Sequence, residues 1–274
     1  MIKDRESLLV ATPEKLRIEF NLDVRTRQEV LSVDREKKQV NVRNLETGEV
    51  YSERYDKLIL SPGAKPFVPP VGGVDLPGVL VLRHIGDMDA IKAQVDTGEA
   101  KAAIVVGGGF IGLEMAENLM HRGLEVTVIE MLDQVMTPLD IEMAALVHEH
   151  LRVKNVRLAL GDGLNAIARQ NGRLAVTLQS GKVAVADIVI LSVGVRPESD
   201  LGRAAGLELG PRGHIVVNDV LQTSDPDIYA VGDVTQVRCA VTGQPTAIAL
   251  AGPANRQARL AADHIVGRDG AYQG

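Results

Sequence analysis

Three glycines at a fixed spacing, Gly107, Gly109 and Gly112, form the clearest chemical pattern in the sequence. They follow an apolar, β-branched run and precede a helical pattern, which places them in a strand-to-helix turn. In such a turn the first glycine permits the bend, the second lets a pyrophosphate approach the backbone, and the third lets helix and strand pack closely. Free N–H groups at the helix start attract phosphate oxygens. The alternative is that the glycines serve only the turn.

A carboxylate follows at the position along the chain that a dinucleotide site requires. Glu130 ends the next predicted strand, and its carboxylate can accept hydrogen bonds from a ribose diol. A 2′-phosphate would be repelled, since like charges about 4 Å apart cost roughly 4 kcal/mol at an effective dielectric constant of about 20. The next residues, Met131 to Asp133, supply no base. The pattern therefore predicts an NAD(H) site that prefers NADH, unless an arginine folds in from elsewhere.

An internal repeat suggests a second domain of the same plan. Residues 56–66 and 187–197 share an Asp, an Ile-Leu-Ser run, a Gly, a base and a Pro at equivalent positions. The glycine turn precedes the second copy by about 80 residues, and the same spacing from the first copy falls before Met1. We therefore expect the chain to lack the opening βαβ unit of its first domain. The missing unit would leave an exposed sheet edge for a partner chain or a second copy to cover.

The remaining patterns predict an α/β fold, because strands and helices alternate from residue 103 onward. A helix starting at Thr12-Pro13, a small antiparallel meander and a Pro/Gly-rich connection at 65–77 precede that region. Meander strands are expected at 28–33, 39–44 and 49–55, and helices at 86–97, 110–122, 140–153, 200–207 and 253–266.

Composition and charge exclude several classes of function. The formal net charge is −6, which argues against a nucleic-acid partner. No apolar run approaches the roughly 18 residues that a membrane span needs, and the charged N-terminus does not resemble a signal peptide, so we expect a cytoplasmic protein. Cys239 is the single cysteine and cannot form an internal disulfide or a cysteine-based zinc site. His148 and His150 are two residues apart on a predicted helix and do not share a face, so no metal site is predicted.

At this point the motifs resemble a known family, the pyridine nucleotide–disulfide oxidoreductases, which are FAD- and NAD(P)H-binding flavoenzymes. Residues 107–114 resemble the family's NAD turn, 192–197 its crossover between domains, and 223–233 its second FAD motif. Residues 12–15 and 250–256 are most similar to the branch of coenzyme A-disulfide reductases, NADH oxidases and NADH-dependent persulfide reductases.

The resemblance implies two Rossmann-like dinucleotide-binding domains, the FAD/NAD(P)-binding fold, with the first domain incomplete. Residues 1–77 would be the second part of the FAD-binding domain. Residues 78–197 would be the NAD(H)-binding domain inserted in it, and residues 198–274 would return to the FAD-binding domain.

The same resemblance implies roles for individual residues. Asp233 would hydrogen-bond the FAD ribitol, and the helix near Pro253 would point its N-terminus at the flavin pyrimidine. Phe110 would be an aromatic gate beside the flavin. Lys15 would contact a coenzyme A phosphate, the alternative being a solvated helix residue. In full, the expected NAD-binding residues are Gly107, Gly109, Phe110, Ile111, Gly112, Glu130 and Gly194, and the expected FAD-binding residues are Gly63, Asp233, Ala251 and Pro253.

The implied activity is that of an FAD-dependent NADH:disulfide oxidoreductase that acts on coenzyme A disulfide or a persulfide. No catalytic residue is expected in this chain, because the family's redox cysteine would lie upstream of Met1 and Cys239 does not match it. A dimerisation domain would follow Gly274, so the parent protein is expected to be a homodimer. The alternatives are a parent NADH oxidase that reduces dioxygen, an isolated NADH-binding module without activity, and a scaffold with a vestigial nucleotide fold.

Overall fold

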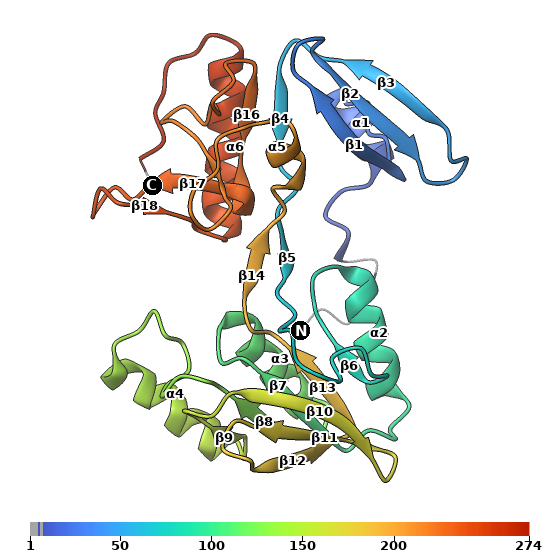
Figure 1. The fold of residues 1–274 in the computed structure, drawn as a ribbon, viewed down its shortest axis with the longest axis vertical. Helices are drawn as coiled ribbons and strands as arrows, with labels where there is room; N and C mark the ends of the chain where they lie inside the picture. The colour runs from blue at the N-terminus through green and yellow to red at the C-terminus, as the bar shows by residue number, and fades with distance from the viewer. Residues whose placement is uncertain (1–4, 6–7, 274) are drawn as a thin grey trace. The chain divides into compact units, whose positions relative to one another are not determined.

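The computed structural model describes residues 5 and 8–273, which form two compact units (Figure 1). The inserted unit is Ala64–Arg196. The flanking unit comprises the described residues up to Gly63 together with those from Pro197 onward. The chain therefore leaves one unit, completes the other, and returns.

A five-stranded parallel sheet forms the centre of the inserted unit. Its order is β6-β13-β7-β8-β9, and every neighbouring pair is parallel. This order is that of a Rossmann-type half-sheet, so the predicted fold class is confirmed. The strands are β6 (Val79–Leu80), β7 (Ala102–Val106), β8 (Glu125–Ile129), β9 (Arg157–Ala159) and β13 (Ile188–Leu191), and the helices are α2 (Ile85–Asp96), α3 (Phe110–His121) and α4 (Ile141–Val153).

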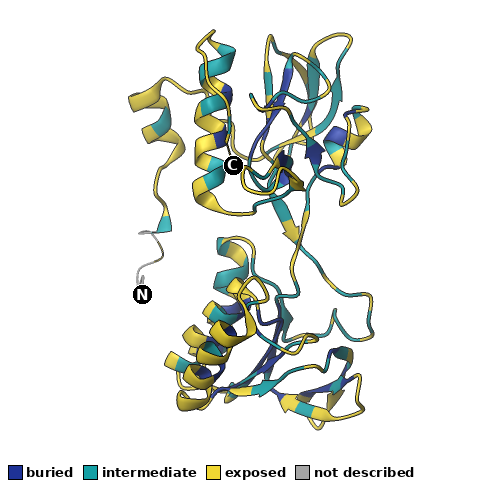
Figure 2. Ribbon diagram, turned by 90° about the vertical axis from the view of Figure 1, so that its left-hand side faces the viewer, coloured by how far each residue is buried: buried dark blue, intermediate teal, exposed yellow. Residues whose placement is uncertain are grey.

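Both faces of this sheet are covered, because alternate residues of each central strand enter different cores. Val105 and Val128 pack in a cluster with residues of α2 and α3. Ile104 and Val189 pack in a second cluster with Ile167, which belongs to an antiparallel sheet of three strands. Those strands are β10 (Leu164–Gln170), β11 (Arg173–Leu178) and β12 (Val183–Ala186). Figure 2 shows the buried strands inside each unit and the exposed outer faces of the helices.

The segment before β6 belongs to the inserted unit by its contacts. The inserted unit was predicted to begin at residue 78, whereas the compact unit begins at Ala64. Val74 and Leu76 of the intervening segment pack against the core cluster that contains Ile167 of β10. The carbonyl of Gly72 accepts the Ile167 N–H at 2.8 Å. A Cβ on Gly73 would lie 1.8 Å from the Ile167 carbonyl oxygen, so only glycine fits there. The structural boundary of the unit therefore precedes Ala64.

The flanking unit is built around two parallel strands, β4 (Leu58–Leu60) and β16 (Ile228–Ala230), and the long helix α6 (Ala251–Ile265). The meander consists of β1 (Gln28–Asp34), β2 (Gln39–Asn44) and β3 (Val50–Arg54). The other elements are α1 (Pro13–Phe20), α5 (Asp200–Ala204), β15 (Ile215–Val216), the 3-10 turn η2 (Gly232–Val234), β17 (Thr235–Arg238) and β18 (Pro245–Thr246).

The internal repeat is visible as repeated backbone structure. In each copy a parallel strand, β4 or β13, is followed by a glycine with positive φ, at +74° for Gly63 and +104° for Gly194. Each glycine leads into a three-residue strand, β5 (Ala64–Pro66) or β14 (Val195–Pro197), and these two strands pair. The N–H of Phe67 donates to the Gly194 carbonyl at 2.9 Å, and the N–H of Glu198 donates to the Gly63 carbonyl at 2.9 Å. The two copies thus hydrogen-bond reciprocally where the chain enters and leaves the inserted unit.

Most long predicted elements are confirmed to within a few residues. The helix expected at 253–266 begins earlier, at Ala251, because a proline in the first turn has no N–H that the helix would need. The helix expected at 200–207 ends at Ala204, and Gly206 follows with a φ of +71°. In the part of the chain that the structure describes, no helix is both long and apolar enough to cross a bilayer.

Candidate dinucleotide-binding site

The site in the inserted unit lies at the carboxyl ends of three neighbouring strands. The glycine turn follows β7, Glu130 follows β8, and Ser192 follows β13. The chain continues from β7 through α3 to β8 on one side, whereas β13 pairs with β7 on the other. This is the switch point of an open parallel sheet, where ligands of α/β proteins bind. The sheet therefore gathers these residues at one edge.

Two of the three glycines are required by close backbone contacts. Gly107 has a φ of +110°, and a Cβ there would lie 2.3 Å from the Ser192 carbonyl oxygen. A Cβ on Gly112 would lie 1.9 Å from the Gly107 carbonyl oxygen, because the first turn of α3 packs directly on the glycine turn. Any side chain at either position must displace backbone.

Gly109 differs, because none of the residues that the structure describes occupies the space beside it. It is exposed, precedes α3 as the N-cap residue, and a Cβ at this position would have no heavy atom within 4 Å. The first-turn N–H groups of the 12-residue helix have no partner within the helix and carry its positive dipole end. Phe110 and Ile111 are 58% and 40% exposed at the same end. Steric demands of the fold explain Gly107 and Gly112, whereas Gly109 leaves room for a ligand.

The Glu130 carboxylate is held by two backbone N–H groups. Its Oε2 accepts the N–H of Gly108 at 2.7 Å, and its Oε1 accepts the N–H of Leu132 at 2.9 Å. Each oxygen retains a lone pair for another donor. The carboxylate is thus fixed beside the glycine turn as an acceptor, and the contact through Gly108 was not anticipated from the motif.

Ser192 is a site residue that the sequence analysis did not single out. Its hydroxyl donates to the Val106 carbonyl at 2.9 Å and lies 2.8 Å from the place where a Gly112 Cβ would be. Gly194, two residues on, is exposed, and a Cβ there would meet no described heavy atom within 4 Å. The repeat contains a serine at both equivalent positions, Ser61 and Ser192, and that was the available signal.

In the flanking unit the structure brings Asp233 next to the start of α6. Asp233 lies in η2, directly after Gly232, whose φ is +80°. Gln257 of α6 is 1% exposed, and its Oε1 accepts the Gly232 N–H at 2.7 Å. A Cβ on Gly232 would be 3.7 Å from that of Ala254. Gln257 therefore ties the predicted FAD motif to the helix, a role that its sequence position did not indicate.

The other expected flavin and coenzyme A residues lie in different settings. Ala251 is exposed and Pro253 half-buried in the first turn of α6. Gly63 follows β4, at the same strand edge as η2, since the Val231 N–H donates to the Leu60 carbonyl at 3.0 Å. Lys15 is exposed on α1, where the Thr12 hydroxyl caps its N–H at 3.2 Å, and no described contact holds its side chain.

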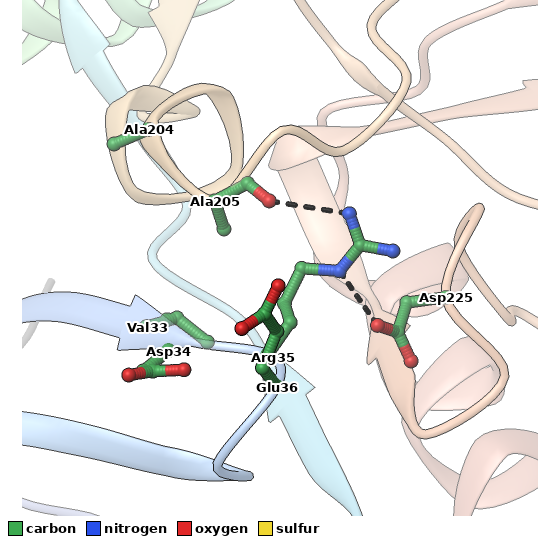
Figure 3. Close-up of a pocket in the computed structure, with 7 residues that line it drawn as sticks. All are labelled: Val33, Asp34, Arg35, Glu36, Ala204, Ala205 and Asp225. Atoms are coloured by element: carbon green, nitrogen blue, oxygen red, sulfur yellow. Dashed lines mark hydrogen bonds and ion pairs between the residues drawn. The ribbon is translucent and has the colours of Figure 1, made fainter.

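A polar pocket of about 570 Å³ lies between the β1–β2 turn and α5 (Figure 3). Arg35 crosses it, and its Nε donates to Asp225 Oδ2 at 2.6 Å. Its Nη1 donates to the carbonyls of Ala205 and Gly206, each at 3.3 Å. Arg35 therefore links the meander to Asp225, which precedes β16, and to the carboxyl end of α5.

The described residues hold no cluster of His, Cys, Asp and Glu that could bind a metal ion. His148 is buried and His150 exposed on α4, so the two do not share a face. Cys239 is a free thiol near the β17–β18 hairpin. A hydrogen bond from the Thr242 side chain is the main cause that lowers the pKa of this thiol.

A family model described as pyridine nucleotide-disulphide oxidoreductase matches residues 2–258. The chain belongs to this family. It is 38% identical over 267 residues to an NADH oxidase of Methanocaldococcus jannaschii, covering 97% of this chain and 59% of that protein. It is 35% identical over 269 residues to a coenzyme A disulfide reductase of Staphylococcus aureus, covering 98% and 60%.

A solved structure supports the same relationship. The crystal structure of reduced Bacillus anthracis CoADR-RHD superposes with a TM-score of 0.96 at 49% identity, covering 100% of this chain and 49% of that one. The chain spans about 60% of the length of the curated relatives that it matches. The activities named for those relatives are therefore activities of longer chains.

Proposed function

We propose that the inserted unit binds NADH at the carboxyl edge of its parallel sheet. The observation that carries this proposal is the contrast within the glycine turn. Gly107 and Gly112 are forced by backbone contacts, whereas Gly109 opens onto free space in front of the α3 N-terminus. In this arrangement the first-turn N–H groups bind the pyrophosphate, and Glu130 accepts from the ribose diol.

Phe110, Ile111 and Gly194 contribute the rest of the proposed NAD site. Phe110 and Ile111 are large apolar side chains exposed at the start of α3, where apolar surface can cover a nicotinamide ring and exclude water. Gly194 follows β13 with a φ of +104° and leaves the backbone free to approach the ligand. These residues orient the nucleotide and transfer no proton or electron themselves.

We infer that the flanking unit supplies part of an FAD site. Asp233 presents a carboxylate to ribitol hydroxyls, and the exposed first turn of α6 at Ala251 and Pro253 directs its positive end at the flavin. Gly63 shares the strand edge with η2. The hydrogen bond between the Gly232 N–H and Gln257 supports this FAD site, because it holds the turn that carries Asp233 against α6.

The parent protein is then an FAD-dependent NADH:disulfide oxidoreductase that reduces coenzyme A disulfide or a persulfide, with Lys15 contacting a coenzyme A phosphate. When bound, NADH supplies a hydride and FAD accepts it, and the protein contributes binding and orientation. The names of the relatives support coenzyme A disulfide and equally support oxidase activity. A homodimeric, cytoplasmic parent is part of this proposal.

The visible absorption spectrum of the purified chain, recorded before and after anaerobic addition of NADH, tests both the proposed FAD site and the proposed NADH site. An oxidised-flavin spectrum that bleaches is expected if the FAD residues suffice. A colourless protein that binds NADH by calorimetry supports the alternative, an NADH-binding module without activity. A chain that binds neither cofactor contradicts the proposal. For the parent protein, NADH consumption with coenzyme A disulfide, a persulfide or dioxygen as the acceptor decides among the three reactions.

The preference for NADH is tested by removing the charge of Glu130. Glu130→Gln removes the charge that would repel a 2′-phosphate and keeps one oxygen that can accept a backbone N–H, while the N–H of either Gly108 or Leu132 loses its acceptor. We expect the ratio of NADPH to NADH affinity to rise at least about tenfold. Glu125→Gln is the control, since it lies at the opposite end of β8 and pairs with Arg157 at 2.5 Å. An unchanged ratio in Glu130→Gln contradicts the ribose assignment.

A further inference from the structure

Gly108, the residue between the first two motif glycines, is held on both sides by one segment of chain. Its N–H donates to Glu130 Oε2 at 2.7 Å, and its carbonyl accepts the Met136 N–H at 2.8 Å. Val135 lies against it, since a Cβ on Gly108 would be 2.7 Å from Val135 Cγ1. The segment 130–136 therefore determines where the glycine turn and the Glu130 carboxylate lie.

The carboxyl-terminal part of this segment is hydrogen-bonded to a buried histidine of α4. His148 is 7% exposed, and its Nε2 accepts the N–H of the fully buried Val135 at 3.1 Å. Because a backbone N–H can only donate, His148 must be neutral with its proton on Nδ1. Burial lowers the pKa of His148, and the charge of Arg152 lowers it further, which favours the neutral form.

We propose that His148 is a positioning residue of the dinucleotide site, acting through Val135 and the segment 130–136 on Gly108 and Glu130. This inference rests on the proposed NADH site. The hydrogen bond of His148 goes to Val135 and not to the glycine turn, so His148 acts on the turn through the segment 130–136. Without the acceptor, the Val135 N–H would be buried and unpaired, and the segment would shift to satisfy it.

Substitutions at one position separate positioning from packing. His148→Leu removes the acceptor at similar volume, and His148→Gln restores a side-chain oxygen of similar reach. Leu151→Ala is the matched control, because Leu151 lies one turn further along the same buried face of α4 and has no hydrogen bond to the segment. NADH dissociation constants are measured by calorimetry at a temperature at which thermal unfolding shows every variant to be folded.

We expect His148→Leu to weaken NADH binding about tenfold and His148→Gln to recover most of that loss. Leu151→Ala should lower the melting temperature while the dissociation constant stays within about twofold of the unchanged protein. Wild-type affinity in His148→Leu overturns the proposal. Equal weakening in His148→Leu, His148→Gln and Leu151→Ala also overturns it, because histidine would then serve packing alone.

Amide hydrogen exchange of the ligand-free chain tests the anchor without NADH. His148→Leu should accelerate exchange at Val135, Met136 and Gly108, and Leu151→Ala should not do so selectively. If these amides exchange as slowly in His148→Leu as in the unchanged chain, His148 does not hold the segment 130–136 in place. If the unchanged chain binds no NADH, the proposed function fails, whereas the exchange pattern still decides whether His148 holds the loop.

Discussion

The two copies of the repeat, residues 56–66 and 187–197, share a backbone but have different surroundings. Both form a strand, a glycine with positive φ and a second short strand. Asp187 accepts the N–H groups of Lys101 and Ala102, each at 2.8 Å, and pairs with Arg173. The equivalent Asp56 is exposed, and no contact is described for its carboxylate within residues 8–273. Local sequence determined the backbone, whereas the unit around it determined what each side chain does.

The same contrast applies to the helices that begin near each candidate site. In the inserted unit α3 packs on the glycine turn with no room for a Cβ at Gly112. In the flanking unit a Cβ on Gly252, in the first turn of α6, would meet no described heavy atom within 4 Å, and the buried amide of Gln257 accepts the N–H of Gly232 in the neighbouring turn. One site is formed by close backbone packing and the other by a side-chain hydrogen bond.

The largest expected effect is the difference in stability between adding a methyl group at the start of α3 and adding one at the start of α6. Gly112→Ala forces the Gly107 carbonyl aside and should lower the free energy of unfolding by about 3 kcal/mol or more. Gly252→Ala, in the first turn of α6, has no heavy atom within 4 Å and should change it by less than about 1 kcal/mol. Urea unfolding checks both. Similar losses in the two variants would contradict the difference between the units.

Replacing the side-chain anchor of the flanking unit should have the next largest effect. Gln257→Leu leaves the Gly232 N–H without its acceptor and should cost about 1–3 kcal/mol. Gln244→Leu is a control in the same unit, because Gln244 is exposed and no described hydrogen bond involves its side chain. Urea unfolding measures both, and NADH affinity should be unchanged in either. A large loss of NADH affinity in Gln257→Leu would show that the two sites are coupled.

The repeated aspartates should respond unequally to loss of charge. Asp187→Asn weakens three charge-assisted contacts and should cost about 1–2 kcal/mol. Asp56→Asn should change the free energy of unfolding by less than about 0.5 kcal/mol. Chemical denaturation at neutral pH compares them. Equal losses of stability in Asp187→Asn and Asp56→Asn would mean that the contribution of the aspartate depends on the repeat sequence and not on its surroundings.

The smallest expected effect is a pH dependence in the flanking unit. Hydrogen bonds from Lys38 and then Lys57 lower the pKa of Asp227, so the folded state favours the carboxylate. Their stabilisation is complete above the unfolded pKa of about 3.9 and is lost as the pH falls through the lower folded pKa. The difference between the unchanged protein and Asp227→Asn should therefore shrink as the pH falls below the unfolded pKa and vanish once the pH is below the lower folded pKa. A difference that persists there would indicate that the contacts act through geometry and not through charge.

The sequence allowed the fold class, the long helices, the meander and the position of the glycine turn to be predicted. These features depend on local periodicity and on glycine spacing, both of which are visible in a short window. His148 and Gln257 could not be predicted as site residues, because each acts on backbone outside its own helix. The serine shared by the two repeat copies was a signal for Ser192, but its hydrogen bond to the Val106 carbonyl joins residues 86 positions apart and could not be predicted. The two-residue strand β6 is too short for any periodic pattern.

The reciprocal hydrogen bonds between the two repeat copies also bear on how the chain folds. In the flanking unit, Lys57 must meet Asp227 across a sequence separation of 170 residues. Closing so long a loop is entropically costly when the intervening chain is disordered. Once the inserted unit has folded, Phe67 and Gly194 are hydrogen-bonded at its two ends, and the effective loop is reduced to the short segments outside it. If the inserted unit folds first, the pairing of β4 with β16 closes a much shorter loop than the sequence separation implies.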